Sequence, residues 1–434
     1  MLPNLHRCSH NVLDFLEISS LDGVFLANIV LVKTLGNEIQ QKIQTVISYD
    51  NGAKWHYLTA PRHDPLGKEI ICGYKDQCHL HLALTHRHRE AASFITKAKS
   101  IGMILALGNL GSQLVEDLDA LHPFLSIDGG ITWKFLDSKP SFLGFGDLGS
   151  LIILSSQDFQ MKFSWNMGLN WTELPMKSLK DQGSVTNILS HPLHNAQEFF
   201  VIGEKGESES EASGVVVLVD FSELNPHQCQ KPDDYEIFTP KAYEETCILG
   251  RKVSYSRKKP ESQCYNGWDF EPIESQTNCE CTSWDYECDW GFHKVSGGCE
   301  PISLRMVQTN FSTECYSRHN KQYLISLGYR KILGDSCEGK TVFDPIFMEC
   351  PIFNLGLSKS QIFWVGIALI LMIIVCLGYQ KRLLLKMRVL SYWGDFTHQS
   401  RLHKDDIVFN DVSYNEEESS DLICEGKALP GDSP

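Results

Sequence analysis

Residues 48–55 read Ser48-Tyr-Asp50-Asn-Gly52-Ala-Lys-Trp55, a pattern called the box below, and it returns twice along the chain. The second box holds Ser126, Asp128, Gly130 and Trp133, and a weaker third box holds Ser164, Asn166, Gly168 and Trp171. Asp or Asn can hydrogen-bond the backbone amides of a turn, Gly accepts a positive φ, and the Trp of the returning strand packs inward. We therefore expect each box to be a structural hairpin turn within one sheet.

The spacing of the boxes predicts a repeated sheet. The first two boxes are 78 residues apart and the last two are 38 residues apart. The first spacing is about twice the second, so a single repeat length fits if one copy of the box has been lost near Arg87. Short apolar or alternating runs, such as 151–154, fill residues 20–222 between Gly, Asp, Asn and Pro. Repeats of about 40 residues are typical of four-stranded propeller blades. We expect four such blades, the last one a hairpin of residues 199–204 and 215–221.

Cysteines dominate the next part of the chain. Ten of the 15 cysteines fall within residues 229–350, and Cys72 and Cys78 lie close enough to close a small loop. Twelve cysteines can then pair, as an oxidising compartment favours. Zinc is the alternative, because Cys279-x-Cys281 followed by Cys288 could ligate a metal. The segment lacks paired C-x-x-C halves, so we favour disulfides.

A membrane span is predicted after the cysteines. Residues 362–379 are uncharged and apolar, and eighteen residues at about 1.5 Å rise each just cover a hydrocarbon core of about 30 Å. Lys381 and Arg382 follow, which puts the C-terminal tail in the cytosol and the cysteines on the luminal side. A buried core helix is the alternative, and it leaves this basic flank unexplained.

The first residues and the charge set further expectations. Residues 1–31 lack the basic-then-apolar layout of a signal peptide, and four blades would leave sheet edges open. We therefore expect this chain to be the C-terminal part of a longer protein, or a gene product read without its first exons. The formal net charge of −15, with no basic stripe, argues against nucleic acid as a partner.

Several further motifs, together with the boxes, resemble one family. They are Tyr235-Glu-Ile-Phe-Thr-Pro, Cys247-Ile-Leu-Gly-Arg-Lys, Cys279-x-Cys281 leading to Asp285-Tyr-Glu-Cys288, and Gly328-Tyr-Arg-Lys-Ile. The pattern over residues 20–350 resembles the sortilin family of vacuolar and lysosomal sorting receptors.

The resemblance implies a mainly β fold: a partial propeller with about four of ten blades, two small disulfide-rich modules and a single transmembrane helix. The implied segments are 1–222 for the blades, 223–302 and 303–355 for the modules, 362–379 for the span and 380–434 for a disordered tail. The implied disulfides are Cys229–Cys264, Cys247–Cys279, Cys281–Cys337, Cys288–Cys299, Cys315–Cys350 and Cys72–Cys78. No ligand-contact residue is carried over, because the family's propeller-wall contacts fall in the missing blades.

The acidic tail carries the expected sorting signal. Glu418, Leu422 and Ile423 fit the acidic dileucine pattern that clathrin adaptors bind, and a retrograde coat is a second candidate partner. A solvated acidic tail is the alternative. Asn170 and Asn310 begin N-x-S/T glycosylation motifs.

Four histidines, His79, His81, His86 and His88, suggest a pH switch. We favour the alternative that they are strand residues satisfied by their neighbours.

We predict no catalytic, cofactor-binding or metal-binding residue. The expected function is that of a single-pass type I sorting receptor in Golgi and endosomes, with the plasma membrane as a further location. It would bind luminal protein or peptide cargo. The alternatives are a sialidase-like propeller glycosidase and an adhesion or signalling receptor with an EGF-like stalk.

Overall fold

The computed structural model describes residues 5–390 apart from several stretches. These stretches are 7–12, 36–37, 72–77, 86, 89–90, 116, 140–141, 176–182, 191–196, 206–212, 225–226, 243–245, 268, 304–321 and 350–358. By its internal contacts the chain divides into a first unit, with described residues in 5–303 and 326–346, and a second unit, with described residues in 322–325 and 347–390.

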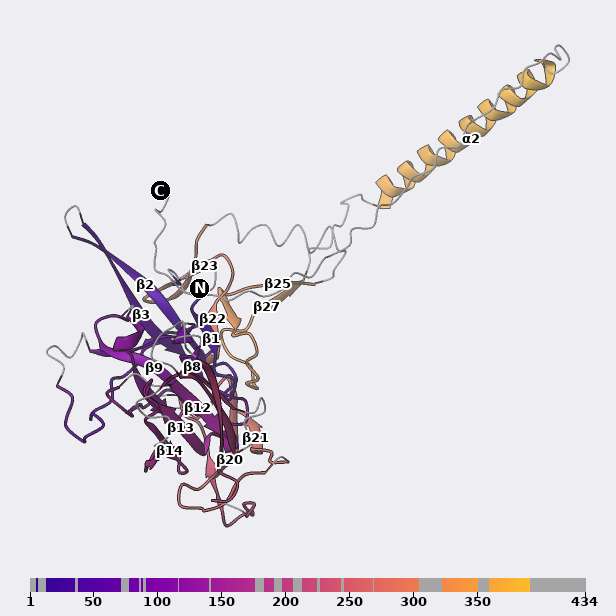
Figure 1. Ribbon diagram of the computed structural model, residues 1–434. Coiled ribbons are helices and arrows are strands. Elements are labelled where there is room, and N and C mark those ends of the chain that lie inside the picture. Colours follow the sequence, from indigo (N-terminus) through magenta and orange to yellow (C-terminus); the bar gives the residue numbers. More distant parts are fainter. Residues whose placement is uncertain are drawn as a thin grey trace. The chain divides into compact units, whose positions relative to one another are not determined.

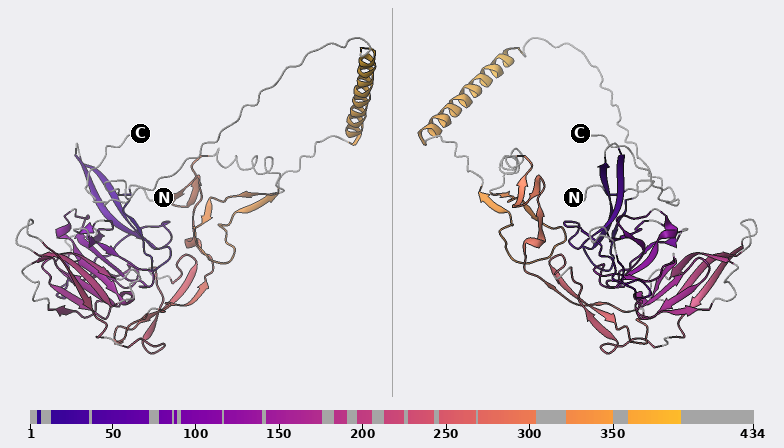
Figure 2. Two further views of the ribbon diagram at one scale, coloured as in Figure 1. Left: turned by 45° about the vertical axis from the view of Figure 1, so that its right-hand side comes forward. Right: turned by 90° about the vertical axis from the view of Figure 1, so that its left-hand side faces the viewer.

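Four antiparallel sheets follow one another in the first unit (Figures 1 and 2). The first is β1 (Phe15–Glu17), β2 (Phe25–Leu35), β3 (Glu38–Ser48) and β4 (His56–Tyr57), in that order. The second orders β11 (Lys134–Phe135), β10 (His122–Ser126), β9 (Ile104–Gly111) and β5 (His79–Leu82), with β8 (Phe94–Ile95) also on β9. The third is β12 (Phe142–Gly146), β13 (Leu151–Ser155), β14 (Met161–Ser164) and β15 (Thr172–Leu174), and the fourth is β16 (Gly183–Ser190), β17 (Glu198–Lys205) and β18 (Ser213–Asp220).

The sheets stack because their central strands are apolar on both faces. In β9, Ile104 belongs to the core shared with the first sheet, while the next residue, Leu105, belongs to the core shared with the third. In β13, Ile152 faces the second sheet and Ile153 faces the fourth. Successive side chains of a strand point to opposite faces, so a continuous apolar run feeds two cores. This stacking in chain order is consistent with neighbouring blades of a β-propeller.

The boxes occupy equivalent places in three consecutive sheets. They join β3 to β4, β10 to β11, and β14 to β15. The expectation that a copy was lost near Arg87 is therefore wrong. The longer first spacing arises because the second sheet receives extra chain before β9, including the small hairpin of β6 (Arg87–His88) and β7 (Ala91–Ala92).

The cysteine-rich part of the first unit consists of small sheets. One orders β19 (Tyr235–Phe238), β20 (Arg251–Lys258) and β21 (Ile273–Asn278). Two-stranded sheets join β22 (Tyr286–Cys288) to β26 (Tyr329–Lys331), and β23 (Phe292–Val295) to β24 (Gly298–Pro301). One hydrophobic cluster of its described residues includes the disulfide Cys229–Cys264, which packs with Tyr235 and Phe270. Disulfide bonds thus take the place of the apolar core that such small sheets cannot form.

The second unit is described here by itself. It contains β25 (Gln322–Ile325), which pairs with β27 (Ile346–Glu349), and the helix α2 (Lys359–Leu390). Side chains of α2 are described at 366–381. Among the described residues, no helix combines the length and the apolar character that crossing a membrane requires. The transmembrane helix predicted at 362–379 is not confirmed.

Candidate functional site

The three boxes share one hydrogen-bond pattern. In each, the Ser hydroxyl donates to the acid or amide two residues on and accepts the N–H of the Gly four residues on. In the second box these distances are 2.8 Å to Asp128 Oδ1 and 2.8 Å from Gly130 N. The glycines have φ values of 86°, 92° and 74°, in the region that favours glycine. Each box therefore begins at the last residue of a strand, its serine, and forms the turn that leads into the next strand.

The box tryptophans differ from one another in burial. Trp133 is 6% exposed and belongs to the first core, whereas Trp55 and Trp171 are half-buried. The indole N–H of Trp133 donates to Gly130 O at 3.0 Å, and that of Trp55 donates to Gly52 O at 2.9 Å. The expected inward packing is thus complete only for Trp133, whereas Trp171 is half-buried against the second core and Trp55 is half-buried at its own turn.

Among its described residues, the cysteine-rich part is cross-linked by four disulfides. They join Cys229 to Cys264, Cys247 to Cys279, Cys281 to Cys337 and Cys288 to Cys299, and they coincide with four of the pairs that the resemblance implies. Cys78 is also disulfide-bonded. Its expected partner Cys72, and both members of the pair Cys315–Cys350, lie outside the described residues.

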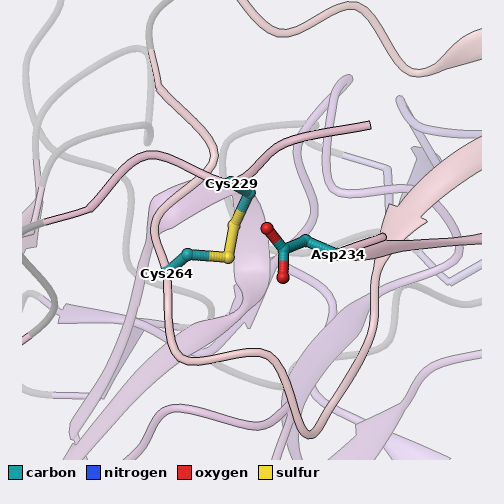
Figure 3. A group of neighbouring side chains, drawn as sticks. All are labelled: Cys229, Asp234 and Cys264. Atoms are coloured by element: carbon teal, nitrogen blue, oxygen red, sulfur yellow. A yellow bond between two sulfur atoms is a disulfide. The ribbon is translucent and has the colours of Figure 1, made fainter. Parts of the chain in front are cut away.

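The zinc interpretation is wrong for the cysteines that suggested it. Cys279, Cys281 and Cys288 are each bonded to another cysteine, and zinc binds thiolates rather than disulfide sulfur. Figure 3 shows another group of side chains close enough together to be considered as metal ligands, in which Asp234 approaches the Cys229–Cys264 disulfide. Asp234 Oδ2 instead accepts the N–H of Gln230 at 2.8 Å. This group stabilises a turn and offers one carboxylate only.

A buried ion pair joins the third sheet to the cysteine-rich part. Asp147 lies in η4 (Asp147–Gly149), and its Oδ2 is 3.7 Å from Lys258 Nζ of β20. Both side chains are buried. Asp147 Oδ1 accepts the N–H of Asn266 at 2.7 Å, and Lys258 Nζ donates to Cys264 O at 2.7 Å. Burial raises the pKa of Asp147 against the opposing charge of Lys258, and burial lowers the pKa of Lys258.

Further contacts bring the cysteine-rich part onto the other two box sheets. Arg257 donates from Nη1 to Ile127 O at 2.7 Å, beside the second box. Its guanidinium also pairs with Glu236 and lies 4.1 Å from the ring centroid of Phe238. At the first box, Asn51 Nδ2 donates to Leu333 O at 2.6 Å. The three box sheets thus each contact the disulfide-bonded segment.

His81 is a structural residue. It is fully buried in β5, where its Nδ1 accepts the N–H of Thr45 at 3.2 Å, which leaves Nε2 to donate to Gly111 O at 3.1 Å. Burial lowers the pKa of His81 to about 4. The favoured interpretation, a strand histidine satisfied by neighbours, fits this residue. His86 and the side chain of His88 lie outside the described residues, so the pH switch stays a prediction for them.

The predicted tail and glycosylation residues are placed only in part. Asn170 is exposed, and its backbone N–H donates to Asn166 Oδ1 at 2.8 Å in the third box. Asn310 and the sorting residues Glu418, Leu422 and Ile423 lie outside the described residues. Their roles stay predictions from the sequence.

Sequence reasoning missed the Asp147–Lys258 pair. Lysine is seldom fully buried, so Lys258 carried no sequence signal for an interior position. The neighbouring Lys259 is chemically the same residue, and only the tertiary structure distinguishes the two.

The described architecture is that of a mainly β, disulfide-bonded protein with stacked, propeller-like sheets. The family model described as sortilin, neurotensin receptor 3, matches residues 1–185, and the corresponding C-terminal model matches residues 190–350. This chain therefore belongs to the sortilin family.

Its curated relatives include fungal vacuolar protein sorting/targeting proteins 10. That of Trichophyton verrucosum is 30% identical over 374 residues, which is 81% of this chain and 25% of the relative. That of Talaromyces marneffei is 30% identical over 403 residues, which is 87% of this chain and 26% of the relative. This chain thus spans about a quarter of the length of the relatives it matches.

Solved structures give weaker similarities. YCF48 bound to D1 peptide is 12% identical with a TM-score of 0.23, over 64% of this chain and 70% of that chain. A GH74 xyloglucanase from Xanthomonas campestris is 10% identical with a TM-score of 0.27, over 77% of this chain and 46% of that chain. These scores are too low to carry an argument about the fold or the activity.

Proposed function

We propose that this chain acts as a sorting receptor that binds luminal protein or peptide cargo and directs it from the Golgi to endosomes and the lysosome or vacuole. The observation that supports this most directly is membership of the sortilin family across residues 1–350, with relatives named for vacuolar sorting and targeting. Such a role needs binding surfaces and no covalent chemistry. We therefore also propose that the chain is not an enzyme.

The proposal includes a type I arrangement. Blades in 1–222 and cysteine-rich modules in 223–302 and 303–355 would lie in the lumen, where disulfides persist. Residues 362–379 would anchor the chain, and the basic residues after them would hold 380–434 in the cytosol. The support for the anchor is the uncharged sequence of this stretch and its place within α2 (Lys359–Leu390).

The tail would recruit clathrin adaptors. Its proposed signal places Glu418 four residues before the aliphatic pair Leu422 and Ile423, in an otherwise polar and acidic tail. An extended peptide of this kind can insert two aliphatic side chains into a partner's pockets while its acid meets a basic group.

A reporter assay tests the tail. A single-pass reporter carrying residues 380–434 should concentrate in perinuclear endosomes, and Leu422→Ala with Ile423→Ala should shift it to the cell surface. The matched control is Val412→Ala with Leu429→Ala, which removes two aliphatic side chains elsewhere in the same tail. Equal surface levels for all three reporters would refute the dileucine assignment.

A further inference from the structure

A cavity of about 380 Å³ lies where the first box meets the cysteine-rich part, entirely within the first unit. The first sheet contributes Tyr49 and Lys54 to its lining. The cysteine-rich part contributes Leu249, Ile332, Trp284 and the acids Asp285 and Asp335. Ligand sites commonly enclose about 300–1,000 Å³, so this cavity can hold one long side chain with part of a peptide.

The cavity combines an apolar surface with an exposed aromatic ring. Leu249 and Ile332 are 6% and 3% exposed, whereas Trp284 is 63% exposed. The ammonium of Lys54 lies 3.7 Å from the centroid of the Trp284 ring. A cation over an aromatic face is attracted by the ring's quadrupole. The chain itself thus shows that this ring accepts a positive group.

Two carboxyl groups lie close together beside the ring. Oxygens of Asp285 and Asp335 are within 4.8 Å of one another. Asp285 Oδ2 accepts the N–H of Thr282 at 2.6 Å, and Asp335 Oδ1 accepts the N–H of Cys337 at 2.8 Å. Among the side chains that the structure describes, no Lys or Arg forms an ion pair with either acid. A cation placed between them would relieve their mutual repulsion.

The protonation of the pair agrees with this geometry. Burial, and then the neighbouring charge of Asp285, raise the pKa of Asp335 to about 6. The raised pKa reflects the repulsion that a carboxylate at Asp335 meets beside Asp285. Burial lowers the pKa of His56, which also lines the cavity, so this histidine is neutral there and adds no positive charge.

We propose that this cavity is a binding site for a basic side chain, arginine or lysine, of a peptide ligand. The two carboxyl groups would bind its charged end, and the face of Trp284 would cover its stem. Lys54 would compete with the ligand for the same ring. An acidic ligand group would instead meet both carboxylates, so the charge of the lining selects a cation. The site goes beyond the proposed sorting role and does not depend on it.

A binding measurement on the purified full chain tests the site. The probes are N-acetyl-leucyl-arginine amide and the same peptide with citrulline, which keeps the shape of arginine and lacks its charge. We expect the arginine peptide to bind at least about tenfold more tightly near pH 7.4, since a charged pair that loses its charge forfeits about 1.4 kcal/mol or more. Equal affinities, or no saturable binding of the arginine peptide, would overturn the proposal.

Matched variants locate the binding. Asp335→Asn and Trp284→Ala should each weaken arginine-peptide binding about fivefold or more, because each removes one of the two attractions. Asp119→Asn and Trp290→Ala are the controls, since both residues are exposed and lie outside this cavity. Weakening by the controls as large as that by the test variants would place the peptide elsewhere.

A gain of affinity gives a readout that misfolding cannot imitate. Lys54→Met keeps the length and apolar stem of the side chain and removes the competing ammonium. It should strengthen arginine-peptide binding about threefold or more by freeing the Trp284 ring. Unchanged or weaker binding would overturn the competition. Because these measurements need neither the tail nor a cell, their failure would leave the reporter assay of the sorting role unaffected.

Discussion

Asp147 and Lys258 form a buried ion pair whose Oδ2–Nζ separation is 3.7 Å, and this pair joins a turn of the third sheet to a strand of the cysteine-rich part. A buried ion pair is weak evidence of net stabilisation, but the removal of one partner leaves an uncompensated charge. Each charge therefore depends on the other, because either one alone would be buried without an opposite charge.

Lys258→Met should lower the free energy of unfolding by about 3–5 kcal/mol, because Asp147 then remains buried without its cation. The double variant Asp147→Asn with Lys258→Met should be less destabilised than the sum of the two single changes. Urea denaturation measures both effects. Lys252→Met, at an exposed position of the same strand, is the control and should leave the midpoint almost unchanged. A strictly additive double variant would contradict a direct coupling.

Ser126→Ala should destabilise the second sheet, since the hydroxyl bonds both Asp128 and the N–H of Gly130. Buried groups that lose a hydrogen-bond partner cost about 1–3 kcal/mol each. Thermal unfolding should show a melting temperature several degrees lower than that of Ser138→Ala, which changes an exposed serine outside the box. Equal melting temperatures for the two variants would show that the box hydroxyl is dispensable.

His81 should make the fold less stable as the pH falls. Its pKa is lowered to about 4 in the folded state, whereas an unfolded histidine has a pKa of about 6.5. As the pH falls, the unfolded chain therefore binds the proton first. The contribution of neutral His81 to the free energy of unfolding is complete above about pH 6.5 and is lost between about pH 6.5 and 4. Between pH 7.5 and 5.5 the loss is about 1.3 kcal/mol.

The variant His81→Gln should flatten this part of the stability profile, whatever it does to the stability at neutral pH. Urea midpoints at the two pH values give the comparison. His227→Gln, at an exposed position, should keep the pH dependence of the unchanged protein. An identical slope in His81→Gln would mean that His81 is not the group that titrates.

The disulfides should differ in how much they contribute to the free energy of unfolding. Cys281–Cys337 closes a separation of 56 residues and Cys288–Cys299 one of 11. In the chain-entropy account, the longer loop stabilises more, by about 1.4 kcal/mol here. Replacing both members of the first pair by serine should therefore lower the urea midpoint more than the same change in the second pair. The opposite order would show that native contacts, rather than loop closure, decide the difference.

The box sequence predicted much of the fold because its interactions are local. Ser48 and Gly52 lie within one turn, and their hydrogen bond depends on a backbone conformation that glycine allows. The same reasoning gave a wrong explanation for the spacing of 78 residues. A period in sequence cannot distinguish a lost repeat from chain inserted before β9 (Ile104–Gly111), because both lengthen the spacing equally.

The apolar runs predicted strands but not their partners. Ile104 and Leu105 look alike in sequence, yet they belong to two different cores. Assignment to a core depends on which sheets stack, and stacking follows from contacts between residues far apart in the chain.

The sequence by itself determined that this protein is mainly β, has hairpin boxes and uses disulfides in place of a large core in its cysteine-rich part, because local turn chemistry and composition fix these properties. Only the tertiary structure decided that Lys258 is buried against Asp147 and that Asp285, Asp335 and Trp284 share a cavity with Lys54. The burial and the pKa of a charged group depend on what surrounds it in space. Residues far apart in the sequence supply these surroundings, as Lys54 and Asp335 do in the cavity.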